Sequence, residues 1–159
     1  MKRKHLLYIV LILGAASAAS SCSSISPDFS SSDYNSFNTA GNYSGHFAFY
    51  SGAFTDSTVK CTVTLTQQLG NITGRISSET RQVMGVAIDD SLTGSIAYYA
   101  NYLARITGYI FPRSKSLAEA TQDSTAIPID FTVNTLDGML VGNIFPPNTG
   151  SMIEIVLSK

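Results

Sequence analysis

The chain offers few side chains whose types and spacing could do chemistry together. Its two histidines are His5 and His46, and only His46 lies beyond the N-terminal segment. One histidine and one cysteine on an apolar face do not make a zinc site of the usual composition, so no metal is expected. A catalytic base needs a nucleophile and an orienting acid in space, and serines are abundant, so a hydrolase that uses a serine and His46 is one hypothesis. The alternative is that His46 is an outward-facing strand residue or a structural hydrogen-bonding group.

The acidic residues point to no defined reaction. Asp89 and Asp90 stand side by side, and we expect them in a turn between two strands, where Asp often bonds the backbone. Glycoside hydrolysis needs paired carboxylates, which could be drawn from Glu79, Asp89, Asp130 or Glu154, but any acidic chain offers as many pairs. The chain has neither a calcium loop nor a phosphate-cradling loop. We therefore assign no catalytic residue and expect no cofactor.

The N-terminus has the composition of a secretory signal. The segment Met1–His5 holds three basic residues, Leu6–Leu13 is an unbroken apolar run, and small residues follow up to Ser21, just before Cys22. The apolar run is less than half of the roughly 20 residues that a spanning helix needs. We predict a signal peptide over residues 1–21 that is cleaved after Ser21. An uncleaved anchor helix over Leu6–Ala19 remains the alternative.

The stretch Ala19-Ser20-Ser21-Cys22 resembles the lipobox of bacterial lipoproteins, although that family prefers Leu where this chain has Ala19. The resemblance implies that Cys22 is acylated and becomes the first mature residue, held at a membrane by its acyl chains. Ser23 is not the Asp that retains such proteins in the inner membrane, so the resemblance implies the outer membrane. A rival cleavage motif, Ala16-Ser17-Ala18, would instead leave a soluble exported protein whose Cys22 is free to pair with Cys61.

Charge argues against nucleic acid as a partner. Of ten basic residues, three stand in the first four positions, which leaves seven basic against eleven acidic residues in the remainder. That remainder is mildly acidic and has no basic stripe, so it lacks the electrostatic footprint of a nucleic-acid-binding protein.

Composition divides the exported part into a tether and one domain. Residues 22–42 are rich in Ser, Asn and Asp, which predicts a flexible tether. Phe29, Tyr34 and Phe37 are exceptions; they either contact the outside of the domain or form a first segment across one of its open ends. Residues 43–159 form the domain.

Apolar and polar residues mostly alternate along the domain, which predicts β-strands. The clearest strand is Val59–Gln67, in which Cys61 lies on the apolar side and is expected to be a buried, unreactive thiol. Asp137-Gly138 is a strong hairpin signal. One short helix is expected at Leu117–Gln122, where Ser116 and Glu119 have capping-box spacing. The other candidate strands are Gly45–Tyr50, Ile72–Ser77, Gln82–Ile88, Leu92–Tyr99, Leu103–Phe111, Ile127–Thr135, Met139–Phe145 and Met152–Leu157.

A recurring element favours a closed sheet over a flat sandwich. Four segments place a glycine between apolar residues two positions away on each side, and these glycines are Gly74, Gly94, Gly108 and Gly142. A glycine inside a strand is favoured where a sheet coils tightly or another backbone comes close. The predicted fold is therefore all-β, a single antiparallel barrel or barrel-like meander of about eight strands.

This run of strands is similar to small exported barrels of the avidin and lipocalin type. The chain lacks the Trp residues with which avidins bind biotin and with which lipocalins open, so the resemblance implies a topology and no ligand. The aromatic group Tyr98, Tyr99, Tyr102, Tyr109 and Phe111, with Arg105 among them, either lines a cavity, forms an exposed patch, or divides between the core and its rim.

The expectation for function is a membrane-anchored envelope lipoprotein that acts as a binding or assembly module. Its expected partners are the membrane, through the lipid anchor, and an envelope protein or a small apolar ligand. The alternatives are a small periplasmic hydrolase using a serine and His46, and a purely structural envelope protein.

Overall fold

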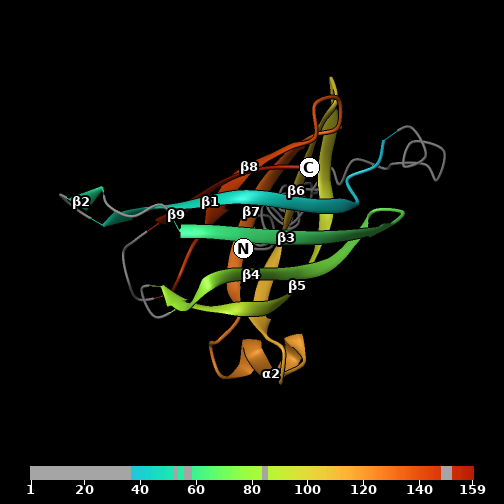
Figure 1. Ribbon diagram of the computed structural model, residues 1–159. Helices are drawn as coiled ribbons and strands as arrows, with labels where there is room; N and C mark the ends of the chain where they lie inside the picture. Colours follow the sequence, from blue (N-terminus) through green and yellow to red (C-terminus); the bar gives the residue numbers. More distant parts are fainter. Residues whose placement is uncertain (1–36, 52–53, 56–58, 84–85, 148–151) are drawn as a thin grey trace, which may run out of the picture.

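The computed structural model describes residues 37–51, 54–55, 59–83, 86–147 and 152–159. These residues form an eight-stranded antiparallel barrel in which each strand pairs with its neighbours in the sequence and β1 closes the circle by pairing with β9 (Figure 1). A two-residue strand, β2 (Phe54–Thr55), extends the far end of β1. The barrel strands are β1 (Gly41–Ser51), β3 (Val59–Gln68), β4 (Asn71–Val83), β5 (Val86–Ala100), β6 (Leu103–Pro112), β7 (Ile127–Asn134), β8 (Met139–Ile144) and β9 (Met152–Ser158).

Strict alternation along the strands builds the core. In β3 the residues Cys61, Val63 and Leu65 are buried, while the residues between them are exposed. The same alternation runs through β7 and β9. Because paired residues of an antiparallel sheet point to the same side, these rows together fill the inside of the barrel with Ile, Leu, Val and Phe side chains. The predicted all-β barrel is confirmed.

The barrel has two unlike ends. At one end, here called the N-terminal end, lie residues 37–40 and the turns 69–70, 101–102 and 135–138. At the other, the helix end, lies the helix α2 (Leu117–Gln122) in the connection between β6 and β7 (Figure 1). The capping box expected for this helix is present, since the Ser116 side chain accepts from the Glu119 N–H and the Glu119 carboxylate accepts from the Ser116 N–H at 2.7 Å.

Residues 37–40 close the N-terminal end. Phe37 is buried and stacks on Tyr99 with ring centroids 3.8 Å apart. Thr39 is fully buried, and both its N–H and its hydroxyl donate to Gln67 Oε1 at 2.8 Å. The Tyr43 hydroxyl donates to the Thr39 carbonyl at 2.6 Å. Phe37 therefore lies across one end of the barrel, which is one of the two alternatives expected for it. Phe29 and Tyr34 are outside the described residues.

The expectation for Asp89 and Asp90 is wrong. Both lie inside β5, which begins at Val86, and they pair with Ser77 and Ile76 of β4. Asp89 faces solvent and Asp90 faces the interior, where its residue is 3% exposed. The prediction failed because a carboxyl at an inward position breaks the apolar alternation from which a strand is recognised.

The four recurring glycines occupy inward-facing strand positions where the backbones of neighbouring strands come close to each other. Gly94 of β5 and Gly108 of β6 are direct partners, and each pairs on its other side with a buried isoleucine. A Cβ built on Gly108 would lie 2.5 Å from the Gly94 Cα and 2.9 Å from the Thr93 carbonyl carbon. Gly142 meets the Asp130 carbonyl and the Phe131 ring in the same way. These contacts are with backbone or buried ring atoms, which cannot move aside without opening the barrel.

Two hairpin turns at the N-terminal end hold bulky residues in the left-handed region. Leu69 has φ 54°, and Asn101 and Tyr102 have φ 51° and 68°. Two-residue hairpin turns with such angles favour Gly or Asn, and a side chain with a Cβ costs about 1–2 kcal/mol there. Leu69 and Tyr102 gain no compensating burial, since they are 54% and 57% exposed.

We predict that Gly108→Val and Gly142→Val each lower the free energy of unfolding by about 1–3 kcal/mol, the usual scale of overpacking. The comparison is Ser95→Val, an exposed position beside Gly94, where valine gains strand propensity on a scale of about 1 kcal/mol. Urea unfolding measures all three. A rise in the urea midpoint for both glycine variants would contradict the tight inward placement.

Candidate functional site

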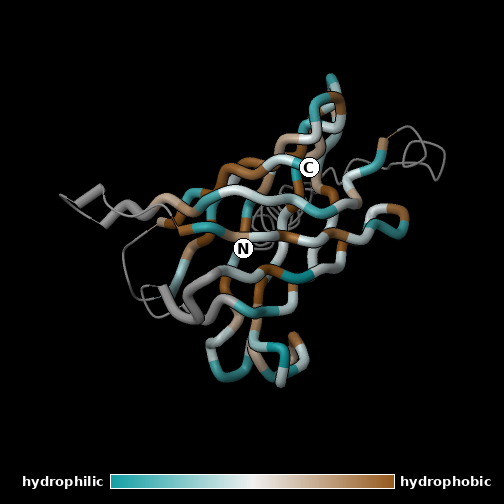
Figure 2. Tube along the Cα trace, viewed as in Figure 1, coloured by the Kyte–Doolittle hydropathy of each residue, from teal (hydrophilic) through white to brown (hydrophobic). Residues whose placement is uncertain are grey.

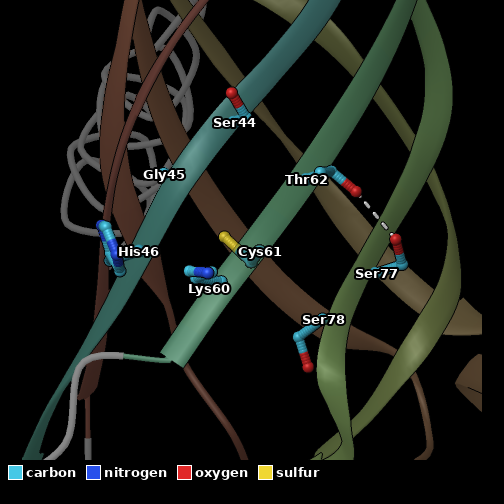
Figure 3. Close-up of a pocket in the computed structure, with 8 residues that line it drawn as sticks. All are labelled: Ser44, Gly45, His46, Lys60, Cys61, Thr62, Ser77 and Ser78. Atoms are coloured by element: carbon cyan, nitrogen blue, oxygen red, sulfur yellow. Dashed lines mark hydrogen bonds between the residues drawn. The ribbon is translucent and has the colours of Figure 1, made fainter.

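An open hollow on the outer wall of the barrel brings His46 together with several hydroxyl side chains. It spans β1, β3 and β4 toward the helix end and has a volume of about 510 Å³ (Figure 3). We call it the His46 groove. Its lining residues are Ser44, Gly45, His46, Lys60, Cys61, Thr62, Ser77 and Ser78.

Strand register places these residues together. His46 of β1 is the direct partner of Lys60 of β3, and Ser44 is the partner of Thr62, so all four side chains stand on the outer face. Thr62 in turn pairs with Ser77 of β4, and their hydroxyl oxygens are 2.8 Å apart in a hydrogen bond. The alternation of Val59–Gln67 gave the outward direction of Lys60 and Thr62. Their closeness to His46 depends on a register that the sequence does not show.

A row of small inward residues forms the floor. Gly45, Cys61 and Ser78 follow one another across β1, β3 and β4. At Gly45 a Cβ would collide with the Val156 carbonyl of β9, so only glycine fits there. Where a strand bends around a barrel at an inward glycine, the outward side chains on either side diverge and leave a hollow above it. The same relation holds at two other hollows, one above Gly94 and Gly108 and one beside Gly142.

The groove suits a polar, hydrogen-bonding group. Among the described lining residues, the titratable side chains besides the thiol are His46 and Lys60, and Lys60 takes part in a further interaction of its own. Hydroxyl groups from three strands line the same hollow (Figure 3). Hydroxyl and imidazole groups both donate and accept hydrogen bonds, so they suit a partner that carries hydroxyl groups.

Cys61 is the buried thiol that the sequence predicts. It is 3% exposed, and burial raises the pKa of the thiol to about 12, so the unreactive protonated form holds at neutral pH. Cys61 is free, and Cys22 lies outside the described residues. The thiol therefore supports the floor of the groove and is not a nucleophile.

The structure brings His46 near serines without joining them. Ser44, Ser77 and Ser78 share the groove with His46, but within the described part of the chain no hydrogen bond joins His46 to a serine. The Ser77 hydroxyl is engaged by Thr62. A hydrolase built on His46 gains no geometric support and stays a prediction.

The candidate carboxylates are engaged or separated. Asp89 bonds Arg75 at 3.0 Å and Arg113 at 3.4 Å, and the hydrogen bond from Arg75 is the main cause of its lowered pKa. The Arg105 guanidinium donates two hydrogen bonds to the Asp130 carboxylate, at 2.9 and 2.6 Å, and these bonds lower the pKa of that carboxyl as well. Asp130 and Glu154 line one small hollow of about 270 Å³, but an acid held ionised by arginine is a poor proton donor. The side chain of Glu79 is not described.

The aromatic group does not form one cavity. Tyr99 packs against the core under Phe37, whereas Tyr98 and Tyr102 are exposed at the N-terminal end. A register shift between Ile96 and Tyr98 turns Tyr98 outward to pair with Arg105. Tyr109 is exposed on the outer wall beside the hollow above Gly94 and Gly108. Of the three expected arrangements, the aromatic side chains therefore adopt the one that divides them between the core and its rim.

No protein-family model, curated protein or solved structure matches this chain. The resemblance to avidin- and lipocalin-type barrels therefore stays an expectation from the sequence.

We predict that Asp90→Asn stabilises the protein at pH 7 and not at pH 4. Burial, and then the neighbouring charge of Asp89, raise the pKa of Asp90 from 3.8 to about 6. The folded protein thus keeps this proton to a higher pH than the unfolded chain, so stability falls as pH rises from about 4 to 6 and stays lower above. Asparagine removes that loss, which we expect to be about 1–2 kcal/mol because the residue keeps some access to water near the barrel end.

Urea unfolding at the two pH values measures the effect. The matched control is Asp89→Asn, which removes the bonds to Arg75 and Arg113 and should not stabilise at pH 7. Equal midpoints for Asp90→Asn and the parent at pH 7 would contradict a destabilising inward carboxylate.

Proposed function

We propose that this chain is a lipid-anchored envelope protein that holds a β-barrel at a membrane and displays the outer wall of that barrel to a partner. Cys22 is the acylated residue, the signal peptide ends at Ser21, and the outer membrane is the destination. The barrel acts as a binding or assembly module.

The observation that carries the proposal is the firm attachment of residues 37–40 to one end of the barrel. Phe37 and Thr39 are buried there, and Gln67 and Tyr43 hold Thr39 by three hydrogen bonds. An anchor at Cys22 would therefore be joined to the N-terminal end of the barrel through a tether of fourteen residues. Among the described residues no helix is long and apolar enough to cross a membrane.

The composition of the His46 groove supports a polar partner. His46 and the hydroxyls of Ser44 and Thr62 supply hydrogen-bonding groups on the outer face. We infer that the partner presents a polar, hydroxyl-rich surface of an envelope protein. An inner cavity for a small apolar ligand gains no comparable support, because the inward rows are filled by packed side chains.

The anchor is tested by Cys22→Ala. In the parent protein, mass spectrometry of the mature N-terminus should find acyl chains on Cys22, and the protein should sediment with membranes. The variant should lose the acyl mass and move to the soluble or unprocessed fraction, because each acyl CH₂ in the bilayer contributes about 0.8 kcal/mol. A mature N-terminus at Ala19 with no acyl mass would contradict the proposal.

The display of the groove is tested by a photo-crosslinking side chain at Ser44, with Ala118 on the exposed face of α2 as the matched position. In living cells Ser44 should give a discrete adduct that Ala118 does not give. Replacing both His46 and Thr62 by Leu should abolish this adduct, because the groove then lacks the hydrogen-bonding groups that hold a polar partner. If neither position gives an adduct, the protein is a structural envelope component and not a binding module.

A further inference from the structure

Every turn at the N-terminal end of the barrel carries an exposed apolar residue. Leu69 stands between β3 and β4, Tyr102 between β5 and β6, and Leu136 between β7 and β8. They are 54%, 57% and 74% exposed, and Leu136 is the most exposed large apolar side chain of the described residues. Leu103 and Met139, next to two of these turns, are exposed as well. We call Leu69, Tyr102 and Leu136 the apolar rim. Figure 2, coloured by residue hydropathy, shows a hydrophobic position in the turn between β3 and β4.

Folding does not explain these side chains. Leu69 and Tyr102 hold left-handed backbone angles that glycine or asparagine would adopt more easily, and Leu69 does so although Gly70 follows it directly. Exposed at the tips of turns, they bury little against the rest of the barrel. A bulky apolar residue that is strained and still solvated indicates a contact outside the chain.

The rim surrounds the point where the N-terminal segment enters the barrel. Residues 37–40 lie at the same end, and Figure 1 shows the chain arriving beside the turn between β3 and β4. Between Cys22 and Phe37 there are fourteen residues, which extend to about 50 Å at most. An acyl group on Cys22 would therefore keep this end within about 50 Å of the bilayer. That reach leaves the orientation of the barrel to direct contacts with the membrane.

Charge is sparse where the rim lies. In residues 37–41, 66–71, 98–103, 134–139 and 158–159 the charged side chains are Asp137 and Lys159. The long connection at the helix end is different, since Arg113, Lys115, Glu119 and Asp123 all belong to it. Phe145 and Met152 are exposed apolar residues at the helix end, so the two ends must be compared directly.

We propose that the apolar rim inserts into the interfacial layer of a lipid bilayer, so that the barrel stands on the membrane with its N-terminal end down. The inference rests on the anchor proposed above. Leucine and tyrosine suit this layer, because leucine enters the acyl boundary and tyrosine keeps its hydroxyl among the headgroups. The covalent anchor supplies attachment, and the rim supplies orientation.

Single tryptophans test the proposal, because the chain contains none of its own. The full-length chain is produced in a bacterial host and reconstituted into vesicles of phosphatidylethanolamine and phosphatidylglycerol. Some vesicles carry bromine on the acyl chains, which quenches buried tryptophan. Leu136→Trp probes the rim, Tyr102→Trp repeats the probe on a second turn, and Ala118→Trp on α2 is the matched control at the helix end.

We expect the emission of Leu136→Trp and Tyr102→Trp to move to shorter wavelength and to lose intensity in brominated vesicles, while Ala118→Trp keeps the emission of a solvated residue. Quenching of Ala118→Trp alone, or a blue shift at the rim without quenching, would overturn the proposal; the second result means that protein and not lipid covers the rim. Mass spectrometry of the same samples separates the two proposals. Acylated Cys22 with a solvated rim overturns only the rim's insertion, and unmodified Cys22 with a quenched rim overturns only the anchor.

Discussion

The pairing of β1 with β9 is the interaction on which the rest of the structure depends. Seven residue pairs from Ser44 to Tyr50 join the first strand to the last, while the other edge of β1 pairs with β3. Without it, β1 and β9 would each present an open edge to solvent and to other chains. Closure also forces the sheet to coil, and coiling in turn requires glycine where backbones approach, as at Gly45 against β9 and at Gly108 against β5. The hollows on the outer wall lie above these inward glycines, where the strands bend around the barrel.

Closure has a cost in folding, because its contacts join the two ends of the domain. The residues of β1 and β9 that pair are separated by more than a hundred positions, and such pairings form slowly. The other barrel strands pair with their neighbours in sequence, so the meander can assemble by hairpins before the circle closes. Residues 37–40 can take their place only when Gln67 and Tyr99 are already in position.

Local pattern predicted the fold better than the site. The alternation around Cys61, the capping box at Ser116 and the inward glycines all follow from neighbours along the chain, and each was found where expected. The predicted turn at Asp89 and Asp90 was wrong because Asp90 occupies an inward position of the strand, where the alternation of apolar residues would require an apolar side chain. The meeting of His46 with Lys60 depends on inter-strand register, and the left-handed angles of Leu69 and Tyr102 depend on the tight two-residue turns; neither can be read from residue types alone.

The strand that follows the N-terminal segment is also the strand that closes the barrel, and this determines how the protein bears mechanical force. A pull on residue 37 passes through the buried Phe37 and then along the axis of β1. The hydrogen bonds of β1 to β3 and to β9 lie across that direction, so tension shears both ladders at once and does not open them pair by pair. A force applied through residue 37 therefore loads both edges of β1 together, so the barrel resists extension from this end of the domain.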